Sequence, residues 1–455
     1  MLGMAVTLDR EALAGTARAA AVGLAALDVR VVALTWVDNA GVTRAKAIPL
    51  DRLAGAAAWG VGMSTVHDVF LVDDSITESE HIGGPVGDLR LHPDLDALTV
   101  LAAQPGWAWA PVDRWTQNGE AYVADQRQFA KRAVERAKDA GITMRMAFEI
   151  EWYLGNEDGT PAAAGPAYGM TRLIEVSQYA QDVLTALTAQ GVPVEQFHPE
   201  YAGGQFEISV SHTDPVGAAD MVVLVRETIR AVSLAHGWRA SFAPVPVAGK
   251  VGNGLHLHFS AWSGDGNLFS GGLGPYGMTG RGESILAGIL ERMPALIGLT
   301  APSVSSRLRR VPQRWAGAYQ CWGLENREAA LRFIAGVKGA GPGAANAELK
   351  CCDASANPYL VVGAVAAVAA ASAFAELRLP AEYQLDPSTL DGFTRPPLLP
   401  TGVEEALTAL AGDEVLCDAL GKELLNAHIA VHRAEAELFA TRTDDEIAEA
   451  VRWKY

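Results

Sequence analysis

Two glutamates alternate with apolar residues in the segment Phe148-Glu-Ile-Glu-Trp152, and this pattern constrains the fold more than any other part of the 455-residue chain. Side chains alternate between the two faces of a β-strand, so Glu149 and Glu151 share one face. Two carboxylates side by side repel each other, and burial increases the cost. Taken alone, the pattern fits a solvent-exposed strand face as well as a strand face that holds a metal cation.

Three further segments bring carboxylates or imidazoles onto apolar strands. The segments are His198–Ile208, Gly252–Ser260 and Ala347–Lys350. Their acidic and histidine candidates are Glu200, Glu207, His256, His258 and Glu348. A lone histidine in an apolar strand is more often an ordinary core or surface residue. Together, however, the four segments supply five carboxylates and one or two imidazoles.

Such an oxygen-rich set favours Mg²⁺ or Mn²⁺ over zinc. The chain has no H-E-x-x-H motif and no Cys ligand pair, which also argues against zinc. Two ions with three protein ligands each can clamp phosphate oxygens during phosphoryl transfer. No G-x-x-x-x-G-K-[ST] loop is present, so metal and arginine would hold any phosphates. Arg309, Arg327 and Arg332 are candidates, although ordinary surface ion pairs explain each one equally well.

Composition narrows the function further. The net charge of −17 argues against a general affinity for nucleic acid. Four cysteines without a C-x-x-C pair, and a start without a basic and then apolar region, favour a reduced, cytoplasmic protein. The uncharged segment Ala354–Ala375 is mostly alanine and contains Asn357-Pro358, so we expect a buried helix there and no membrane span.

The pattern of elements predicts an α+β fold with two domains, residues 1–115 and 116–455. In the first, we expect a helix over Arg10–Leu27 and a hairpin of Val31–Asp38 with Val42–Ile48. In the second, helices alternate with short strands, and two of the predicted helices span Ser284–Leu299 and Asp418–Thr441. The expected strands are Met144–Leu154, Gln205–Val210, Gly254–Trp262, Ala329–Phe333 and Ala347–Lys350.

From about residue 30 to the end, the chain resembles glutamine synthetases. Six family motifs occur in order and at compatible spacing, which is far more specific than any one of them. They are E-x-E at Glu149–Glu151, H-x-E…G-Q-x-E at His198–Glu207, G-x-H-x-H-x-S at Gly254–Ser260, R-L-V-P at Arg309–Pro312, N-R-x-x-x-x-R at Asn326–Arg332, and E-x-R…D-x-x-A-N-P-Y at Glu348–Tyr359.

The resemblance implies a small N-terminal β-grasp domain, a large C-terminal catalytic domain, and active sites between neighbouring subunits of a ring, commonly a double hexamer. It also implies ATP and two or more Mg²⁺ or Mn²⁺ ions as cofactors. The metal ligands would form two sets, Glu151, Glu200 and Glu207 for one ion and Glu149, His256 and Glu348 for the other.

The same resemblance assigns the remaining candidates. Arg327 and Arg332 would stabilise the transferring phosphate. The residues near the glutamate substrate would be Arg309, Lys350, Gly252 and Val251. The residues along ATP would be Glu195, His258 and Ser260.

The departures from the family concern the second substrate. Trp315 stands where the family's flap glutamate helps to bind ammonium, and the loop Trp59–Ser64 lacks the family's ammonium-binding aspartate. Val251 replaces an asparagine, and Lys350 replaces an arginine. Losing both acids removes the negative pocket that a small cation needs, and Trp315 adds an apolar face.

These changes resemble enzymes that join glutamate to organic amines such as ethanolamine, polyamines, isopropylamine or aniline. We therefore predict a γ-glutamylamide product and favour a small amine such as ethanolamine. A polyamine would need an acidic cluster, for which Asp73, Asp74 and Glu78 are the candidates. The alternatives are ordinary glutamine synthesis from ammonium and a non-catalytic sensor or scaffold.

Overall fold

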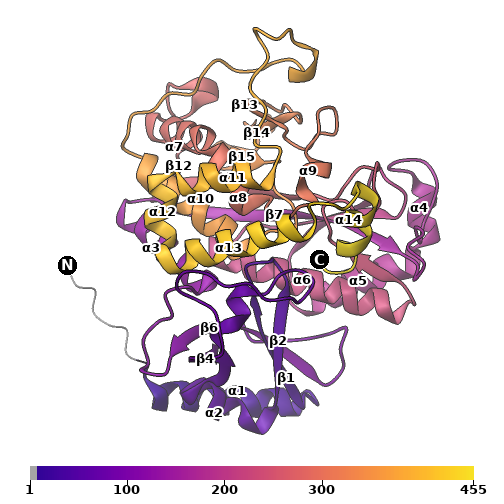
Figure 1. Cartoon of the computed structure of the whole chain (residues 1–455), viewed down its shortest axis with the longest axis vertical. Coiled ribbons are helices and arrows are strands. Elements are labelled where there is room, and N and C mark those ends of the chain that lie inside the picture. Colours follow the sequence, from indigo (N-terminus) through magenta and orange to yellow (C-terminus); the bar gives the residue numbers. More distant parts are fainter. Residues whose placement is uncertain (1–7) are drawn as a thin grey trace.

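The structure is a computed structural model that describes residues 8–455, and two β-sheets organise it (Figure 1). In the small N-terminal sheet, β1 (Val31–Val37) and β2 (Thr43–Pro49) form an antiparallel hairpin, as predicted. β1 also pairs in parallel with β6 (Trp107–Thr116), which completes the mixed sheet of a β-grasp domain. The helix α1 (Arg10–Ala26) packs on α2 (Leu53–Trp59) at the outer end of this domain.

The other strands of this sheet are β3 (Val61–Ser64), β4 (Asp88–Pro93) and β5 (Thr99–Val100). The strand order is β2-β1-β6-β4-β3, with β5 paired to β6.

The large sheet has nine strands, and its main path runs β13-β14-β15-β11-β7-β9-β8. Its strands are β7 (Thr143–Gly155), β8 (Val194–Pro199), β9 (Gln205–Val210), β10 (Arg239–Ser241), β11 (Leu255–Ser263), β12 (Gly266–Asn267), β13 (Tyr319–Leu324), β14 (Ala329–Ile334) and β15 (Asn346–Leu349). Neighbours are antiparallel except β13 and β14, which are parallel. The five strands predicted for this domain all lie in this sheet, with β7 near its middle.

Helices pack around the large sheet, and nearly all residues of the long helix α10 (Pro358–Ser372) are buried. It contacts α3, α6 and α7, which explains why it is apolar on all sides. The helices of this domain are α3 (Gln126–Asp139), α4 (Met170–Glu175), α5 (Ser177–Ala189), α6 (Pro215–Ala235), α7 (Gly280–Glu291), α8 (Met293–Thr300), α9 (Ser306–Arg309), α11 (Val403–Ala411), α12 (Glu414–Leu420), α13 (Lys422–Leu438) and α14 (Asp444–Val451). Within residues 8–455, none of the helices has the length and apolar character needed to cross a membrane.

Two predicted helices differ from the structure. The stretch Ser284–Leu299 divides into the end of α7 and α8, because Pro294 lies in the first turn of α8, where its missing N–H is tolerated. The stretch predicted over Asp418–Thr441 divides at Gly421, whose φ of +77° interrupts the helix between α12 and α13.

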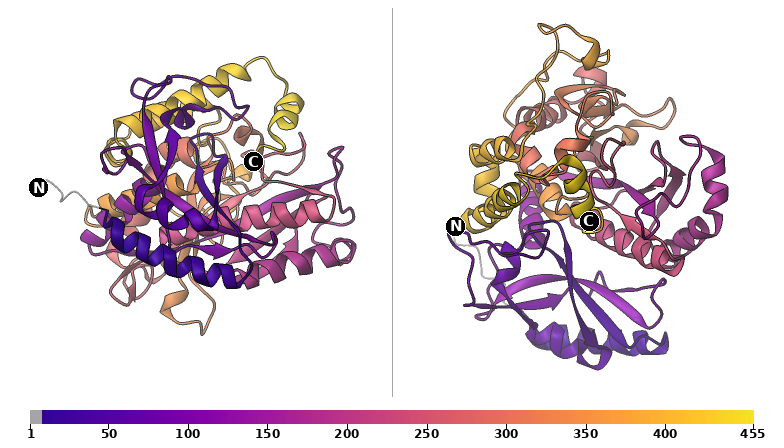
Figure 2. Two further views of the ribbon diagram at one scale, coloured as in Figure 1. Left: turned by 90° about the horizontal axis from the view of Figure 1, so that it is seen from below. Right: turned by 45° about the vertical axis from the view of Figure 1, so that its right-hand side comes forward.

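A polar junction joins the two domains, and Figure 2 shows the N-terminal domain packed against the catalytic domain. The side chain of Asn357 caps α10 and also donates to the carbonyls of Val37 and Asp38 at distances of 2.9 and 3.2 Å. Gly41 approaches the backbone of Ser355 so closely that a Cβ at residue 41 would lie 1.9 Å from the carbonyl oxygen. The junction therefore fixes the small domain against the helix that supports the catalytic sheet.

The buried His428 on α13 provides a stability prediction. Its Nε2 atom lies 2.7 Å from the Gly298 carbonyl, and burial, with His432 nearby, lowers its pKa to about 3. The unfolded chain takes up a proton near pH 6.5, while the folded chain resists it, so this histidine makes stability fall as pH decreases. The slope is about 1.4 kcal/mol per pH unit between these two pKa values.

We expect His428→Gln, which keeps an N–H donor but cannot titrate, to reduce the loss of stability on acidification. Melting temperatures of both proteins measured from pH 7 to pH 4.5 test this. Parallel curves for the two proteins would contradict it.

Candidate active site

The strand register of the large sheet places the predicted site residues in rows on one face. In the first row, His198 on β8 is opposite Glu207 on β9, which is opposite Glu151 on β7. In the next row, Glu149 on β7 is opposite His256 on β11. Direct cross-strand neighbours have Cβ atoms about 5 Å apart, so these side chains are brought into contact.

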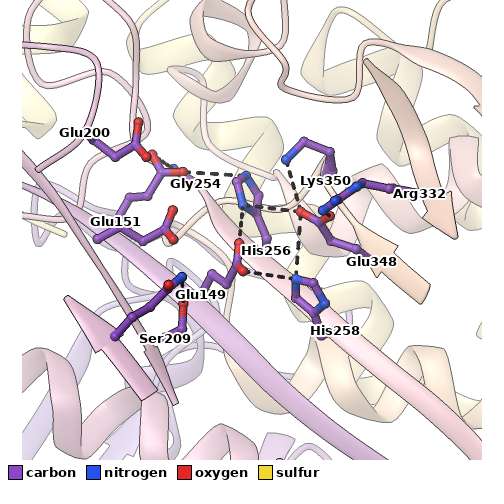
Figure 3. Close-up of polar contacts among 12 residues, drawn as sticks. Glu149, Glu151, Glu200, Ser209, Gly254, His256, His258, Arg332, Glu348 and Lys350 are labelled. Carbon is purple, nitrogen blue, oxygen red and sulfur yellow. Dashed lines mark hydrogen bonds and ion pairs between the residues drawn. The ribbon is translucent and has the colours of Figure 1, made fainter. Parts of the chain in front are cut away.

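The third row contains positive charge as well. His258 on β11 is opposite Glu348 on β15, which is opposite Arg332 on β14. Five adjacent strands, with Glu200 directly after β8, thus contribute to one cluster of carboxylates and imidazoles, which we call the acidic cage (Figure 3). Its members are Glu149, Glu151, Glu200, Glu207, Glu348, His198, His256 and His258.

His256 lies at the centre of the cage. Its Nδ1 atom is 3.4 Å from Glu149 Oε2 and 3.6 Å from Glu348 Oε1, and its Nε2 atom is 3.7 Å from Glu151 Oε1. Burial and the nearby Lys350 ammonium lower the pKa of His256, which favours the neutral imidazole that a metal ligand requires.

The Glu348 end of the cage is rich in cations. The fully buried Glu348 carboxylate lies 3.0 Å from Lys350 Nζ and 2.8 Å from Arg332 Nη1. Burial would raise the pKa of Glu348, but Lys350, His258 and His256 hold it well below its usual range. For His258, burial alone would lower the pKa, yet Glu149 and Glu348 raise it to about 9.

The opposite end has too little positive charge for its carboxylates. Glu207 Oε1 lies 3.0 Å from His198 Nε2, and Glu200 Oε1 lies 3.7 Å from His198 Nδ1. Burial, together with the nearby Glu149 and Glu151 carboxylates, raises the pKa of Glu207 to about 7, and His198 only partly opposes this rise. A divalent cation would supply the missing positive charge, so the residues present fit a metal here.

Backbone and amide groups hold Glu151 in place. Its Oε2 atom accepts hydrogen bonds from Gln205 Nε2 at 2.7 Å and from the Gly254 N–H at 2.9 Å. A Cβ on Gly254 would lie 2.4 Å from His256 Nε2 and 2.7 Å from the Arg309 guanidinium. Only glycine at position 254 therefore allows these side chains to converge.

Three groups of donor atoms lie within 4.8 Å of one another, close enough to share an ion. The groups are Glu149 with Glu207 and His256, Glu149 with His258 and Glu348, and His198 with Glu200 and Glu207. Carboxylate oxygens with a few neutral nitrogens suit Mg²⁺ or Mn²⁺. These groups overlap the two predicted ligand sets but divide the residues differently, with His258 beside Glu149 and Glu348.

His198 joins the cage although the sequence analysis assigned it no role. The His-x-Glu spacing between His198 and Glu200 pointed to such a role. However, the strand β8 was not predicted, so the pairing of His198 with Glu207 could not be seen in the sequence.

The residues predicted to face glutamate lie beside the cage. Arg309 donates to the Lys350 carbonyl at 3.2 Å, and its Nη2 atom is 2.9 Å from His256 Nε2. The Gly252 carbonyl accepts from Gln205 Nε2 at 2.9 Å. Ser260, which was predicted to lie along ATP, is further along β11, where its hydroxyl accepts a hydrogen bond from Trp262 Nε1 at 2.9 Å.

Four other candidates make no hydrogen bond or ion pair to the cage within residues 8–455. Arg327 is exposed in the turn before β14, and Trp315 is exposed on the loop between α9 and β13. Val251 is half-buried, and Glu195 on β8 is exposed and accepts from the Ser211 hydroxyl.

Comparison with known proteins gives two matching family models. The model described as the glutamine synthetase catalytic domain matches residues 123–450, and the glutamine synthetase N-terminal domain model matches residues 18–120. The chain is 51% identical over 440 residues to the γ-glutamylpolyamine synthetase GlnA3 of Streptomyces coelicolor, covering 94% of each protein. It is 31% identical to a glutamine synthetase of Thermococcus kodakarensis, covering 86% of each.

Solved structures agree with these matches. A crystal structure described as a novel glutamine synthase homolog superimposes with a TM-score of 0.85 at 33% identity, covering 94% of this chain and 99% of that one. The two family models together span nearly the whole chain, and the cage lies within the catalytic part. The protein is a ligase that belongs to the glutamine synthetase family.

Proposed function

We propose that this enzyme uses ATP to join the γ-carboxylate of glutamate to an organic amine, giving a γ-glutamylamide. The observation that carries the proposal is the acidic cage, in which carboxylates on adjacent strands face arginine and lysine side chains at one end. The similarity of the whole chain to a γ-glutamylpolyamine synthetase supports the choice of an organic amine.

One set of residues would hold the metal ions, and another set would bind the substrates. The six predicted ligands, with His198 and His258 beside them, would hold two or more Mg²⁺ or Mn²⁺ ions. When bound, ATP supplies the phosphoryl group, and the metal ions neutralise its negative charge. Arg332 and Arg327 would add positive charge to that group, and Glu195, His258 and Ser260 would lie along the nucleotide.

Glutamate would be oriented by the basic residues at the Glu348 end. Arg309 and Lys350 would bind its carboxylates, with Gly252 and Val251 nearby on the Glu151 side of the cage. The γ-carboxylate takes the terminal phosphoryl group of ATP and ADP leaves. The amine nitrogen then attacks the carbonyl carbon, phosphate leaves, and the nitrogen loses a proton to give the amide. No acid takes the family's two ammonium-binding positions, at Trp315 and in the segment Trp59–Ser64, where the end of α2 and the strand β3 replace the expected loop.

For the amine itself, we propose a polyamine on the strength of the 51% identical relative. The preference for ethanolamine stays a prediction that none of the comparisons supports. Of the three acids considered for a second ammonium group, Asp74 already pairs with Arg44 and Lys454 at 2.6 and 3.3 Å, and Asp73 accepts from Ser75. Glu78 is therefore the acid of this loop with the fewest competing contacts in the chain.

Assembly into a ring, here proposed as a double hexamer, would complete the site. Figure 1 shows α2, which ends at Trp59, at the end of the N-terminal domain that is far from the catalytic domain. α9, which precedes Trp315, lies on the other side of the molecule. Trp315 and the segment Trp59–Ser64 can therefore line one amine site only if they come from different subunits. We keep the proposed domain limits of 1–115 and 116–455 and a cytoplasmic location as predictions.

Two other functions were considered. Glutamine synthesis from ammonium is the closest alternative, and the absent acids argue against it. A non-catalytic sensor would have no need of a buried acidic cage, which costs stability to maintain.

One prediction of the proposed function concerns the charge balance of the cage. Glu207→Gln keeps the shape of the side chain but removes one of the repelling charges. We expect metal-free protein with this change to melt at the same or a higher temperature, while its affinity for Mn²⁺ falls by about tenfold or more. Glu227→Gln, on α6 and paired with Arg230, is the matched control and should change neither value. A lower melting temperature with unchanged Mn²⁺ binding would contradict the assignment.

The second prediction concerns the amine. We expect kcat/KM for putrescine or spermidine to exceed that for ammonium, measured with ethanolamine and isopropylamine under identical conditions. Packing of the amine on Trp315 contributes about 0.5–2 kcal/mol, a factor of about two to thirty. The highest value for ammonium would show that the enzyme is an ordinary glutamine synthetase.

The substitution Trp315→Glu tests the same site by putting back the acid that the family has at this position. Restoring the carboxylate should raise kcat/KM for ammonium by about tenfold, because a charged acceptor replaces part of the water around a small cation. The value for the organic amine should fall. No gain with ammonium would show that residue 315 does not face the amine.

The third prediction concerns assembly. Active protein should elute as a large ring in size-exclusion chromatography with light scattering, and separated protomers should have no activity. A fully active monomer would contradict a site shared between subunits.

A further inference from the structure

The loop that carries Trp315 follows an unusual backbone path. This flap loop, residues 310–317, joins α9 to β13. Gln313 and Trp315 have φ angles of +64° and +53°, in the left-handed region that disfavours residues with a Cβ atom. Conformations of this kind persist only where surrounding contacts determine them.

The carboxylate of Glu328 binds the backbone at both Gln313 and Trp315. Glu328 Oε1 accepts the Gln313 N–H at 2.7 Å, and Glu328 Oε2 accepts the Trp315 N–H at 3.0 Å. Glu328 lies between β13 and β14, directly after Arg327, and is only 4% exposed. Hydrogen bonds from backbone N–H groups to a buried charged acceptor are among the strong ones.

The ends of the loop are fixed in other ways. Arg309, just before the loop, donates to the Lys350 carbonyl and contacts His256 in the cage. At the far end, a Cβ on Gly317 would lie 3.0 Å from both Ala330 and Cys351. These contacts join the loop to β14 and to the end of β15, and they do not involve Glu328.

The middle of the loop has few other attachments. Within residues 8–455, the hydrogen bonds of positions 312–316 are the two to Glu328 and a longer one of 3.4 Å from Arg314 to the Gly249 carbonyl. Loss of the Glu328 carboxylate would therefore free the middle of the loop while its ends stay attached.

We propose that Glu328 is a positioning residue for the amine site, because it fixes the backbone that presents the Trp315 ring. This inference rests on the proposed function, in which the amine packs on Trp315. Because Glu328 is only 4% exposed and each of its oxygens accepts a backbone N–H group, it acts on the loop backbone and does not stand in as an exposed acid for the family's missing flap glutamate. The Trp315 side chain remains 57% exposed and accessible to a substrate.

Hydrogen exchange measured on the intact assembled enzyme tests the contact directly. In the wild-type protein, the amides of Gln313 and Trp315 should exchange slowly. Glu328→Ala removes both acceptors. Glu328→Gln has the same shape but turns an NH₂ group toward a backbone N–H, so it also loses a hydrogen bond. Both variants should lose protection in a peptide that spans residues 310–317.

Glu325→Gln is the matched control, because it removes the same charge from an exposed position in the same turn. It should leave protection of the flap loop unchanged. If Glu328→Ala does not fold, the isosteric Glu328→Gln carries the test, with melting temperature as the check on folding.

Kinetics separate a role in the amine site from general damage. In the Glu328 variants, KM for the organic amine should rise by about tenfold. KM for glutamate, and kcat at saturating amine, should stay within about twofold of wild type. Unchanged exchange, or lost protection with an unchanged amine KM, would overturn the proposal. So would an equal loss for glutamate and amine, which would indicate damage through Arg327.

The same experiment separates this inference from the proposed function. A wild-type enzyme that uses ammonium but no organic amine overturns the proposed function and the amine role of Glu328 together. The exchange result would then still decide whether Glu328 holds the flap loop.

Discussion

Repulsion between carboxylates on neighbouring strands is the constraint on which the rest of the structure depends. Two such charges about 5 Å apart repel by about 3 kcal/mol at an effective dielectric constant of ~20. The fold offsets this cost at one end of the cage, where Lys350 and Arg332 contact Glu348. At the other end, His198 is the one positively charged partner of Glu207 among residues 8–455, and the raised pKa of Glu207 reflects the deficit. Stability alone does not explain such an arrangement, but binding of divalent cations does.

The surrounding fold keeps this face rigid and accessible. Apolar side chains on the opposite face of β7 join the core, and α10 supports that core from within. The cap of α10 at Asn357 also ties the N-terminal domain to the catalytic domain. The cage is built mainly on the strands of the large sheet, whereas the proposed amine site combines the flap loop with the end of α2 and β3. This division allows a family to keep one phosphoryl-transfer chemistry while the second substrate changes.

Much of the cage could be predicted because it follows from strand alternation. Glu149 and Glu151 share a face in any strand, and so do His256 and His258. The order and register of the strands were not visible in the sequence, since β8 is short, polar and mostly half-buried and shows no apolar alternation. His198 was therefore overlooked as a member of the cage. The role of Glu328 was equally hidden, because it depends on contact with loop residues 13 and 15 positions earlier in the chain.

Counting bound metal tests the central claim most directly. Metal-stripped protein would be titrated with Mn²⁺, with free ion followed by electron paramagnetic resonance and folding followed by melting temperature. A cage that exists to hold cations should bind at least two ions per chain and melt at a higher temperature when they are bound. Binding of fewer than one ion per chain, with no change in melting temperature, would contradict it.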